Sequence, residues 1–342
     1  MSAPIVQVEG LVKVYPGGTR AVAGIDFAVE EGEFFGFLGP NGAGKTTTMK
    51  ILATLLRKTS GRAVVAGYDV EHDPTAVRRR IGFAMQEVGL DDLATGRDFL
   101  VMQGLLYGQS RKEARRRADE LVELVGLTPV AGRKVGTYSG GMRRRVDLVA
   151  ALMHGPPLLF LDEPTTGLDP QTRLALWEHL EHLNREGTTI FLTTQMMEEA
   201  DRLCRRIAII DQGRLVAQGS PRALKAELVS DVVTIVLSGA HEGERDSQTA
   251  RAEALLREQP YVSEVQSTGA QLAAYVQDGS VAAPDLLRLL HDHQITVSNL
   301  SVASPSLDDV FLKYTGRRIR TEEAGGDEFA QMLRPWLGLG KR

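Results

Sequence analysis

Residues 34–46 read FFGFLGPNGAGKT, and this stretch decides the fold of the chain. The apolar residues before Gly39 are typical of a buried strand, and a helical pattern runs from Thr46 to Leu56. Between them, Gly39 to Thr46 matches the spacing G-x-x-x-x-G-K-[ST] of a phosphate-binding loop, in the strand-then-helix context that this motif requires. The stretch therefore predicts a P-loop on the first turn of an α/β domain.

The glycines of this loop let the backbone curl, so that its N–H groups face bound phosphates. Lys45 is expected to reach the β- and γ-phosphates, the Thr46 hydroxyl to ligate Mg²⁺, and Thr47 to cap the helix or contact the α-phosphate. An ordinary glycine-rich turn is the alternative. The residues predicted to cradle the nucleotide are Gly39, Pro40, Asn41, Gly42, Ala43, Gly44, Lys45, Thr46 and Thr47.

A second acidic element follows the apolar run Leu158 to Leu161, which ends in Asp162 and Glu163. In a parallel sheet, such a strand delivers its terminal residues to the edge where α/β proteins bind ligands. Asp162 is expected to hold Mg²⁺, and Glu163 to orient and deprotonate a water molecule. The alternative is a strand end that carries two solvated acids.

The rest of the chain alternates apolar runs with helical patterns, which predicts an α/β fold with a largely parallel sheet covered on both faces. Runs at 62–67, 81–86, 189–194 and 207–211 are the further expected strands, and residues 92–155 are expected to form an inserted helical lobe. Composition changes after about Leu228. The order β-α-β-β-α-β over 229–316 then suggests a small ferredoxin-like α+β domain, followed by a tail at 317–342 that is either disordered or a docking peptide.

Composition limits the classes of function that are open to the 342 residues. The formal net charge of −4 argues against a nucleic-acid partner, since such domains usually carry a basic face. Cys204 is the single cysteine, which excludes an intramolecular disulfide. No secretory signal and no run of about 18 apolar residues is present, so any transport pore is expected to belong to another chain.

The segment Tyr138-Ser139-Gly140-Gly141-Met142 opens a helical pattern just before the Asp162 strand. It resembles the signature L-S-G-G-Q of ABC ATPases, with Tyr138 for Leu and Met142 for Gln. Ser139, Gly140 and Gly141 at a helix start would form a second anion site. In the ABC family this site faces the γ-phosphate held by the other subunit, and the resemblance implies the same here.

Further positions match motifs of that family. Tyr15 resembles the aromatic residue that stacks on adenine, although a packed edge tyrosine is the alternative. Gln86 resembles the glutamine that contacts Mg²⁺ and links the core to the helical lobe, and Asp169 lies in a segment that resembles the D-loop. Where the family usually has a histidine on the γ-phosphate, this chain has Gln195. Glutamine can bond phosphate and water but carries no proton near neutral pH.

The resemblance covers about residues 5–220 and implies an ATPase that uses ATP and Mg²⁺. The implied catalytic set is Glu163, Lys45, Gln195 and Gln86, with Thr46, Gln86 and Asp162 on the metal. A second ATPase subunit, expected to be an identical copy, and a separate integral-membrane permease are the implied partners. The implied location is the cytoplasmic face of the cell membrane.

Details at 51–56, 138–145, 192–195 and 305–312 are similar to ATPases of daunorubicin-resistance-type drug exporters. That similarity implies export of amphiphilic compounds. An importer ATPase, an ABC ATPase that acts on DNA or ribosomes, and a regulatory, ligand-binding role for the C-terminal domain remain the alternatives.

Overall fold

The computed structural model describes residues 3–85, 89–227, 231–238, 242–268, 271–303 and 305–315. Gln86 and the tail after Thr315 lie outside these ranges, as do the expectations attached to them. The chain divides into two compact units between Gln218 and Gly219, before the composition change at about Leu228. The division comes earlier because α8 (Pro221–Ala226) packs on α11 (Leu307–Thr315), the last helix of the second unit.

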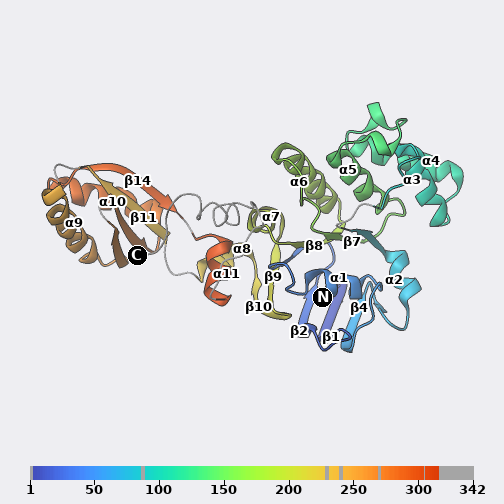
Figure 1. Ribbon diagram of the computed structural model, residues 1–342, viewed down its shortest axis with the longest axis horizontal. Coiled ribbons are helices and arrows are strands. Elements are labelled where there is room, and N and C mark those ends of the chain that lie inside the picture. Colours follow the sequence, from blue (N-terminus) through green and yellow to red (C-terminus); the bar gives the residue numbers. More distant parts are fainter. Residues whose placement is uncertain are drawn as a thin grey trace, which may run out of the picture. The chain divides into compact units, whose positions relative to one another are not determined.

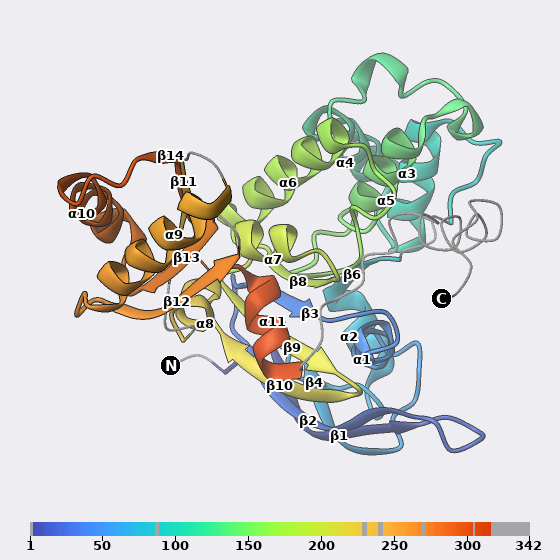
Figure 2. The ribbon, with the colours of Figure 1, turned by 60° about the vertical axis from the view of Figure 1, so that its left-hand side comes forward.

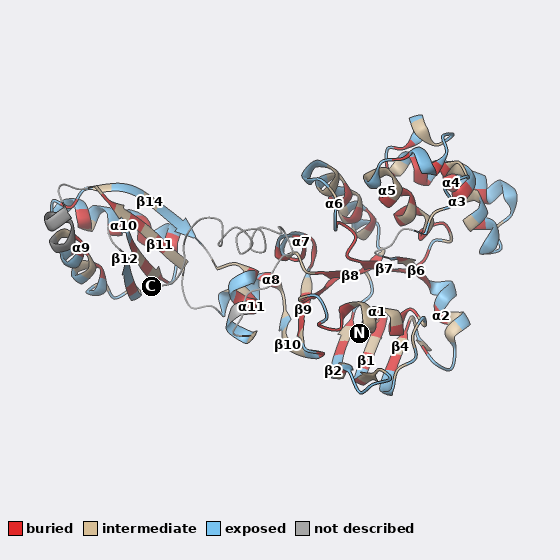
Figure 3. Ribbon diagram, viewed as in Figure 1, coloured by how far each residue is buried: buried red, intermediate tan, exposed pale blue. Residues whose placement is uncertain are grey.

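A six-stranded sheet forms the centre of the first unit, in the order β10-β9-β3-β8-β7-β6. Neighbours from β9 to β6 run parallel, as expected. Every residue of β3, β7 and β8 is buried, as Figure 3 shows for β7 and β8, which explains why these strands are rich in apolar residues. The strands are β3 (Phe34–Leu38), β6 (Ile81–Ala84), β7 (Leu158–Asp162), β8 (Thr189–Thr194), β9 (Arg206–Asp211) and β10 (Arg214–Gly219).

A second sheet, in the order β2-β1-β4-β5, corrects one expectation. The run at 62–67 was expected in the parallel sheet, but it belongs to β4 (Ser60–Val65), which pairs antiparallel with β1 (Val6–Val14). A strand pattern in the sequence does not show which strand is the neighbour in the sheet. Here the neighbour, β1, lies far from β4 along the chain. The sheet also contains β2 (Arg20–Val29) and β5 (Tyr68–Asp69).

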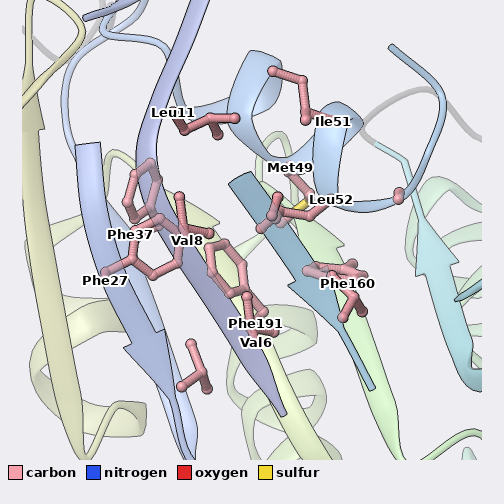
Figure 4. Packing of buried hydrophobic residues seen from close by; sticks show 14 of the residues in the cluster. Val6, Val8, Leu11, Phe27, Phe37, Met49, Ile51, Leu52, Phe160 and Phe191 are labelled. Carbon is pink, nitrogen blue, oxygen red and sulfur yellow. The ribbon is translucent and has the colours of Figure 1, made fainter. Parts of the chain in front are cut away.

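The core of the first unit lies between the two sheets and α1 (Lys45–Leu52) (Figure 4). Phe27 from β2 packs on Phe35 and Phe37 from β3, and all three contact Phe191 from β8 at ring-centroid distances of 5.4–5.9 Å. Aromatic pairs in such geometries add to the stability gained from burial. This cluster holds β3, and therefore the loop after it, rigidly in place.

Residues 96–150 contain three helices, α3 (Gly96–Leu106), α4 (Arg111–Leu124) and α5 (Gly140–Ala150), where the helical lobe was expected. Ser110 and Glu113 form a reciprocal capping box at the start of α4. The three helices group together on the β6 side of the unit, away from β1 and β2 (Figure 2). Two short 3₁₀ turns, at Thr128–Val130 and Val135–Thr137, join α4 to α5.

The described part of the first unit also contains α2 (Pro74–Arg80), α6 (Pro170–Arg185) and α7 (Met197–Leu203) (Figure 1). Among the described residues, no helix has both the length and the apolar character needed to cross a bilayer.

The second unit contains a four-stranded antiparallel sheet in the order β12-β13-β11-β14. β13 lies between β11 and β12, and β11 lies between β13 and β14, so two split β-α-β units interlock as in a ferredoxin-like fold. Ser306 caps α11, as expected. The elements are β11 (Asp231–Leu237), α9 (Glu242–Arg257), β12 (Val262–Thr268), β13 (Gln271–Val276), α10 (Gly279–Asp292) and β14 (Val297–Ala303).

Candidate functional site

The carboxyl ends of three neighbouring strands bring the predicted residues of the first unit to one edge. Leu38 at the end of β3 pairs with Thr194 at the end of β8, and Thr193 pairs with Asp162 at the end of β7. The residues that follow these strands, including Gly39 and Glu163, therefore leave the sheet side by side. This edge is the usual ligand-binding position of a parallel α/β sheet.

The loop from Gly39 to Gly44 passes so close to other backbone that glycine is required at both ends. A Cβ atom on Gly39 would lie 2.3 Å from the carbonyl oxygen of Ile210, and one on Gly44 would lie 2.4 Å from that of Ala21. Gly44 also has a φ of +108°, a region that other residues rarely adopt. The loop then leads directly into α1, whose first N–H groups have no partner within the helix and can bind an anion.

Lys45, the first residue of α1, is almost fully buried at this edge. Its Nζ donates hydrogen bonds to the carbonyl oxygens of Gly39, at 2.8 Å, and Pro40, at 3.1 Å. The same ammonium lies 3.2 Å from Oε1 of Glu163. Burial lowers the pKa of Lys45, and the neighbouring Glu163 and Asp162 carboxylates oppose that shift. A buried cation is thus held where the loop curls.

Asp162 gathers hydroxyl groups from two other elements. Its Oδ1 accepts hydrogen bonds from Oγ1 of Thr46, at 3.0 Å, and from Oγ1 of Thr193, at 2.5 Å. Oxygen donors of this kind suit Mg²⁺, which usually takes one or two protein ligands and completes its shell with water and phosphate. The described residues contain no cluster of three or more His, Cys, Asp or Glu side chains that would hold a metal alone. The Thr46 and Asp162 donors therefore fit a magnesium ion that is shared with phosphates.

Glu163 has an unusual backbone conformation for a residue other than glycine, with a φ of +45°. Its N–H donates to the carbonyl oxygen of Thr193 at 3.0 Å, which ties the turn to β8. Its carboxylate accepts from the Thr166 hydroxyl at 3.4 Å, in addition to its ion pair with Lys45. Left-handed conformations cost about 1 kcal/mol or more, and they cluster at functional sites.

Three other predicted residues lie at the margin of this group. The hydroxyl groups of Tyr15 and Thr47 are 3.3 Å apart, and Nζ of Lys13 lies 5.3 Å from the centre of the Tyr15 ring. Gln195 follows Thr194, whose carbonyl oxygen accepts from the Gly39 N–H at 3.2 Å. Oε1 of Gln195 is buried and has no hydrogen-bond partner in the described part of the chain. An unpartnered buried amide oxygen next to the loop is available to a ligand or to water.

The second predicted group lies at the starts of α5 and α6. Ser139 Oγ accepts from the N–H of Met142 and caps α5, and Asp169 caps α6 by accepting from the N–H of Thr172 at 3.0 Å. A Cβ atom on Gly141 would lie 2.5 Å from Cγ2 of Thr172, so this threonine connects the two caps. Within the described ranges, no hydrogen bond or ion pair joins Ser139, Gly140 or Gly141 to the residues around Lys45.

The sequence interpretation missed three residues that shape the site. Thr193 binds Asp162, and Arg144 on α5 donates to the backbone on both sides of Glu163. Glu199 on α7 is fully buried and accepts from the Thr165 hydroxyl at 2.8 Å. Arg144 lies among three consecutive arginines, and no spacing rule distinguishes the buried one. The EEA stretch at 198–200 hinted that one acid faces inward, since helical periodicity places one of two adjacent residues on the packed face.

Comparisons with known proteins support the same assignment. The family model of the ABC transporter domain matches residues 22–166, and that of the DrrA1-3-like ATP-binding protein C-terminal domain matches residues 219–315. The daunorubicin resistance ATP-binding protein DrrA2 of Streptomyces coeruleorubidus is 44% identical over 324 residues, which cover 95% of this chain and 99% of that protein. The chain belongs to the ABC transporter ATP-binding proteins.

Other relatives of this ABC protein have similar coverage. The daunorubicin/doxorubicin resistance ATP-binding protein DrrA of Streptomyces peucetius is 45% identical, with 94% of this chain and 97% of that protein covered. The linearmycin resistance ATP-binding protein LnrL of Bacillus subtilis is 37% identical, with 92% and 100% covered. As a member of this family, the chain is an ATP-binding and ATP-hydrolysing subunit of an ABC transporter.

Solved structures match about two thirds of the chain. CbiO1 from Clostridium perfringens, part of an ABC transporter complex, is 27% identical with a TM-score of 0.62, and the match covers 66% of this chain and 92% of that chain. The cassette MJ0796, in a dimeric post-hydrolysis state bound to ADP and Pi, is 28% identical with a TM-score of 0.58, covering 63% and 98%. ABC ATPase cassettes work as dimers with a membrane permease.

Proposed function

We propose that this chain powers the export of drugs or other amphiphilic small molecules through a separate permease, at the cytoplasmic face of the cell membrane. The geometry that carries the ATPase part of the proposal is the group formed by Lys45, Thr46, Asp162 and Glu163 at one sheet edge. The drug-export part rests on relatives named for drug resistance, whose similarity extends through both units of the chain.

Each member of the group has a distinct task in the proposed reaction, the hydrolysis of ATP to ADP and phosphate. The loop amides and Lys45 bind the β- and γ-phosphates, while the donors of Thr46 and Asp162 hold Mg²⁺, joined by Gln86. When bound, Mg²⁺ neutralises charge on the phosphates. Glu163, as the general base, orients the attacking water and accepts its proton. The rate then depends mainly on positioning and electrostatic stabilisation.

Gln195 takes the position where this family usually has histidine. Its buried, unpartnered Oε1 supports a role in holding water, because an amide can accept from water and donate to phosphate at once. Gln195→Ala is therefore expected to lower the steady-state rate well below wild type. If Gln195→Ala hydrolyses ATP at the wild-type steady-state rate, Gln195 has no role in hydrolysis.

The second half of the site is proposed to come from another copy of the chain. Ser139, Gly140 and Gly141 at the start of α5 form an anion-binding turn with no contact to the Lys45 group among the described residues. A head-to-tail pair would place this turn of one copy on the γ-phosphate held by the other, with Asp169 at the same interface. ATP would then hold the two copies together, and its hydrolysis would release them.

A hollow of about 330 Å³ between β6, α3 and α5 supports the expected permease contact at about 87–105. Its lining includes Leu55 and Met85, large apolar side chains that are 55% and 44% exposed, together with Phe99 of α3. Exposed apolar side chains around a hollow are typical of a protein contact. Crosslinking from positions along α3 tests this site, and permease contacts found only elsewhere would exclude it.

The decisive experiment uses Glu163→Gln, with Glu178→Gln on the exposed face of α6 as the control. We expect Glu163→Gln to lose ATP hydrolysis by about 10²- to 10⁴-fold and to form a dimer by light scattering under saturating Mg-ATP. Cells that express this variant with the permease should accumulate daunorubicin, whereas cells with the Glu178→Gln protein should export it. A fully active Glu163→Gln protein would contradict the ATPase assignment, and active export of an unrelated solute class alone would contradict the drug assignment.

A further inference from the structure

Arg144 is a buried arginine in the second turn of α5, the helix that follows the Ser139 turn, and only 6% of it is exposed. A guanidinium group cannot lose its proton in a protein, so its burial requires several hydrogen-bond partners. Its neighbours Arg143 and Arg145 are less buried. The burial of Arg144 therefore calls for a specific explanation.

The guanidinium binds backbone on both sides of Glu163. Nε of Arg144 donates to the carbonyl oxygen of Pro164 at 2.8 Å, and Nη2 donates to that of Asp162 at 3.1 Å. The residue between these two carbonyls is the one with the left-handed backbone. One side chain thus holds the peptide group before Glu163 and the carbonyl group of the residue after it, and with them the direction of the Glu163 carboxylate.

The third contact runs to the end of β6. Nη1 of Arg144 donates to the carbonyl oxygen of Met85, the last described residue before Gln86, and also lies 3.4 Å from Oδ2 of Asp147. Met85 and Asp147 both line the hollow proposed above for the permease. A change in that hollow therefore reaches the backbone around Glu163 through one guanidinium group.

We propose that Arg144 is a positioning residue for ATP hydrolysis, which keeps Glu163 aligned with the end of β6 and with the helix that carries the Ser139 turn. The inference rests on the role proposed for Glu163. Arginine suits this task because its planar group offers five donors at fixed angles, whereas lysine offers a single flexible ammonium. Displacing a catalytic group by about 1 Å can reduce a rate 10²-fold without loss of substrate binding.

The test compares Arg144→Met and Arg144→Lys in the full chain, with Arg143→Met as a matched control. Arg143 lies on the same helix and pairs with Asp92 at 2.6 Å, where both side chains reach solvent. We expect Arg144→Met to lower kcat about 10²-fold, while KM and the Kd of ATP stay within about threefold of wild type. Arg144→Lys should restore little of kcat, and Arg143→Met should match wild type.

A double variant shows whether Arg144 acts through Glu163. If it does, Glu163→Gln with Arg144→Met hydrolyses ATP in a single turnover as slowly as Glu163→Gln alone, since the residue being aligned no longer works. A further drop equal to that of Arg144→Met alone would overturn the inference, as would a wild-type kcat in Arg144→Met. ATP binding reports folding of each variant, and Arg144→Lys, which keeps the charge, replaces Arg144→Met if the latter fails to bind ATP.

The outcomes also separate this inference from the proposed function. If Glu163→Gln hydrolyses ATP at the wild-type rate, the general-base assignment fails whatever the Arg144 variants do. If Glu163→Gln is inactive and the Arg144 variants are as active as Arg143→Met, only the positioning role of Arg144 fails.

Discussion

Nζ of Lys45 lies 3.2 Å from Oε1 of Glu163, so the cation proposed to bind phosphate is paired with the proposed catalytic base. Both side chains are more than nine-tenths buried, which makes their attraction stronger than at the surface. Phosphate oxygens of ATP would compete with the carboxylate for the same ammonium. Nucleotide binding and the release of Glu163 are therefore expected to be coupled.

The first prediction follows from that competition. Glu163→Gln should bind Mg-ATP more tightly than wild type, because Lys45 no longer exchanges one anion for another. Lys45→Met should raise the Kd by about 10- to 100-fold, the loss expected for a charge-assisted hydrogen bond. Isothermal titration measures both. In a protein that already carries Lys45→Met, adding Glu163→Gln should not lower the Kd of Mg-ATP. If Glu163→Gln lowers this Kd equally with and without Lys45, the ion pair does not oppose binding.

The second prediction concerns the close approach at Gly44. Gly44→Ala should abolish ATP binding, since the new Cβ would meet the Ala21 carbonyl oxygen at 2.4 Å on a backbone with a φ of +108°. Gly42→Ala is the comparison, because Gly42 also has a positive φ, of +77°, but has no neighbour within 4 Å of its Cβ position. It should lose about 1–2 kcal/mol of stability and keep measurable binding. Equal binding by the two variants would exclude the steric explanation.

The third prediction is a pH dependence at Asp147. Burial raises the pKa of Asp147 to about 6, and the Arg144 guanidinium offsets only part of that shift. Between about pH 4 and 6 the native state then holds a proton that the unfolded state has released, so the free energy of unfolding decreases as the pH rises. Asp147→Asn removes this loss. The free energy of unfolding of Asp147→Asn minus that of wild type should therefore rise by up to about 3 kcal/mol between pH 4 and pH 7.

Urea denaturation of both proteins at several pH values measures this difference. The direction of the trend does not depend on any fixed cost of the substitution, because a fixed cost is the same at every pH. A flat difference for Asp147→Asn would show that Asp147 titrates in the folded protein as it does in water.

The fourth prediction concerns the buried Glu199. Its Oε1 accepts from the Thr165 hydroxyl at 2.8 Å and from Nε1 of Trp177 at 3.0 Å. Glu199→Ala leaves Nε1 of Trp177 without this acceptor and the Thr165 hydroxyl with only Sδ of Met196, at 3.6 Å, so it should lower the free energy of unfolding by about 2 kcal/mol. Burial raises the pKa of Glu199, so the neutral Glu199→Gln, which keeps an acceptor oxygen, should lose less. Thermal unfolding measures this order: the Tm should fall from wild type to Glu199→Gln and further to Glu199→Ala. The exposed Glu198→Ala is the control, and its Tm should equal that of wild type.

The strands that carry the site were predictable from sequence because they are buried on both faces. Phe34–Leu38 and Leu158–Leu161 are continuous apolar runs that end at Gly39 and at Asp162, and Thr189–Thr194 has an apolar centre between threonines. Gly39, Glu163 and Gln195 follow the ends of these strands closely, so the sequence placed them at one edge of the sheet. Their assigned roles stay predictions.

What the sequence did not reveal depends on contacts between distant segments. β4 was expected in the wrong sheet because only its pairing with β1, about fifty residues earlier, decides its place. Arg144 is the middle one of three consecutive arginines, and its partners are carbonyl oxygens of Met85, Asp162 and Pro164. Backbone acceptors leave no trace in the sequence, so a side chain that binds them cannot be recognised by spacing.

The second unit begins and ends at the same place. Nζ of Lys313, on α11, donates to the carbonyl oxygen of Glu227 at 2.8 Å, and the Tyr314 hydroxyl donates to the Glu227 carboxylate, just after α8. The chain therefore enters and leaves the antiparallel sheet domain through neighbouring points, which is the arrangement that tolerates insertion and exchange of domains. Another domain could therefore take the place of residues 231–303 between α8 and α11 during evolution. Such an exchange would leave the residues proposed to bind the nucleotide unchanged.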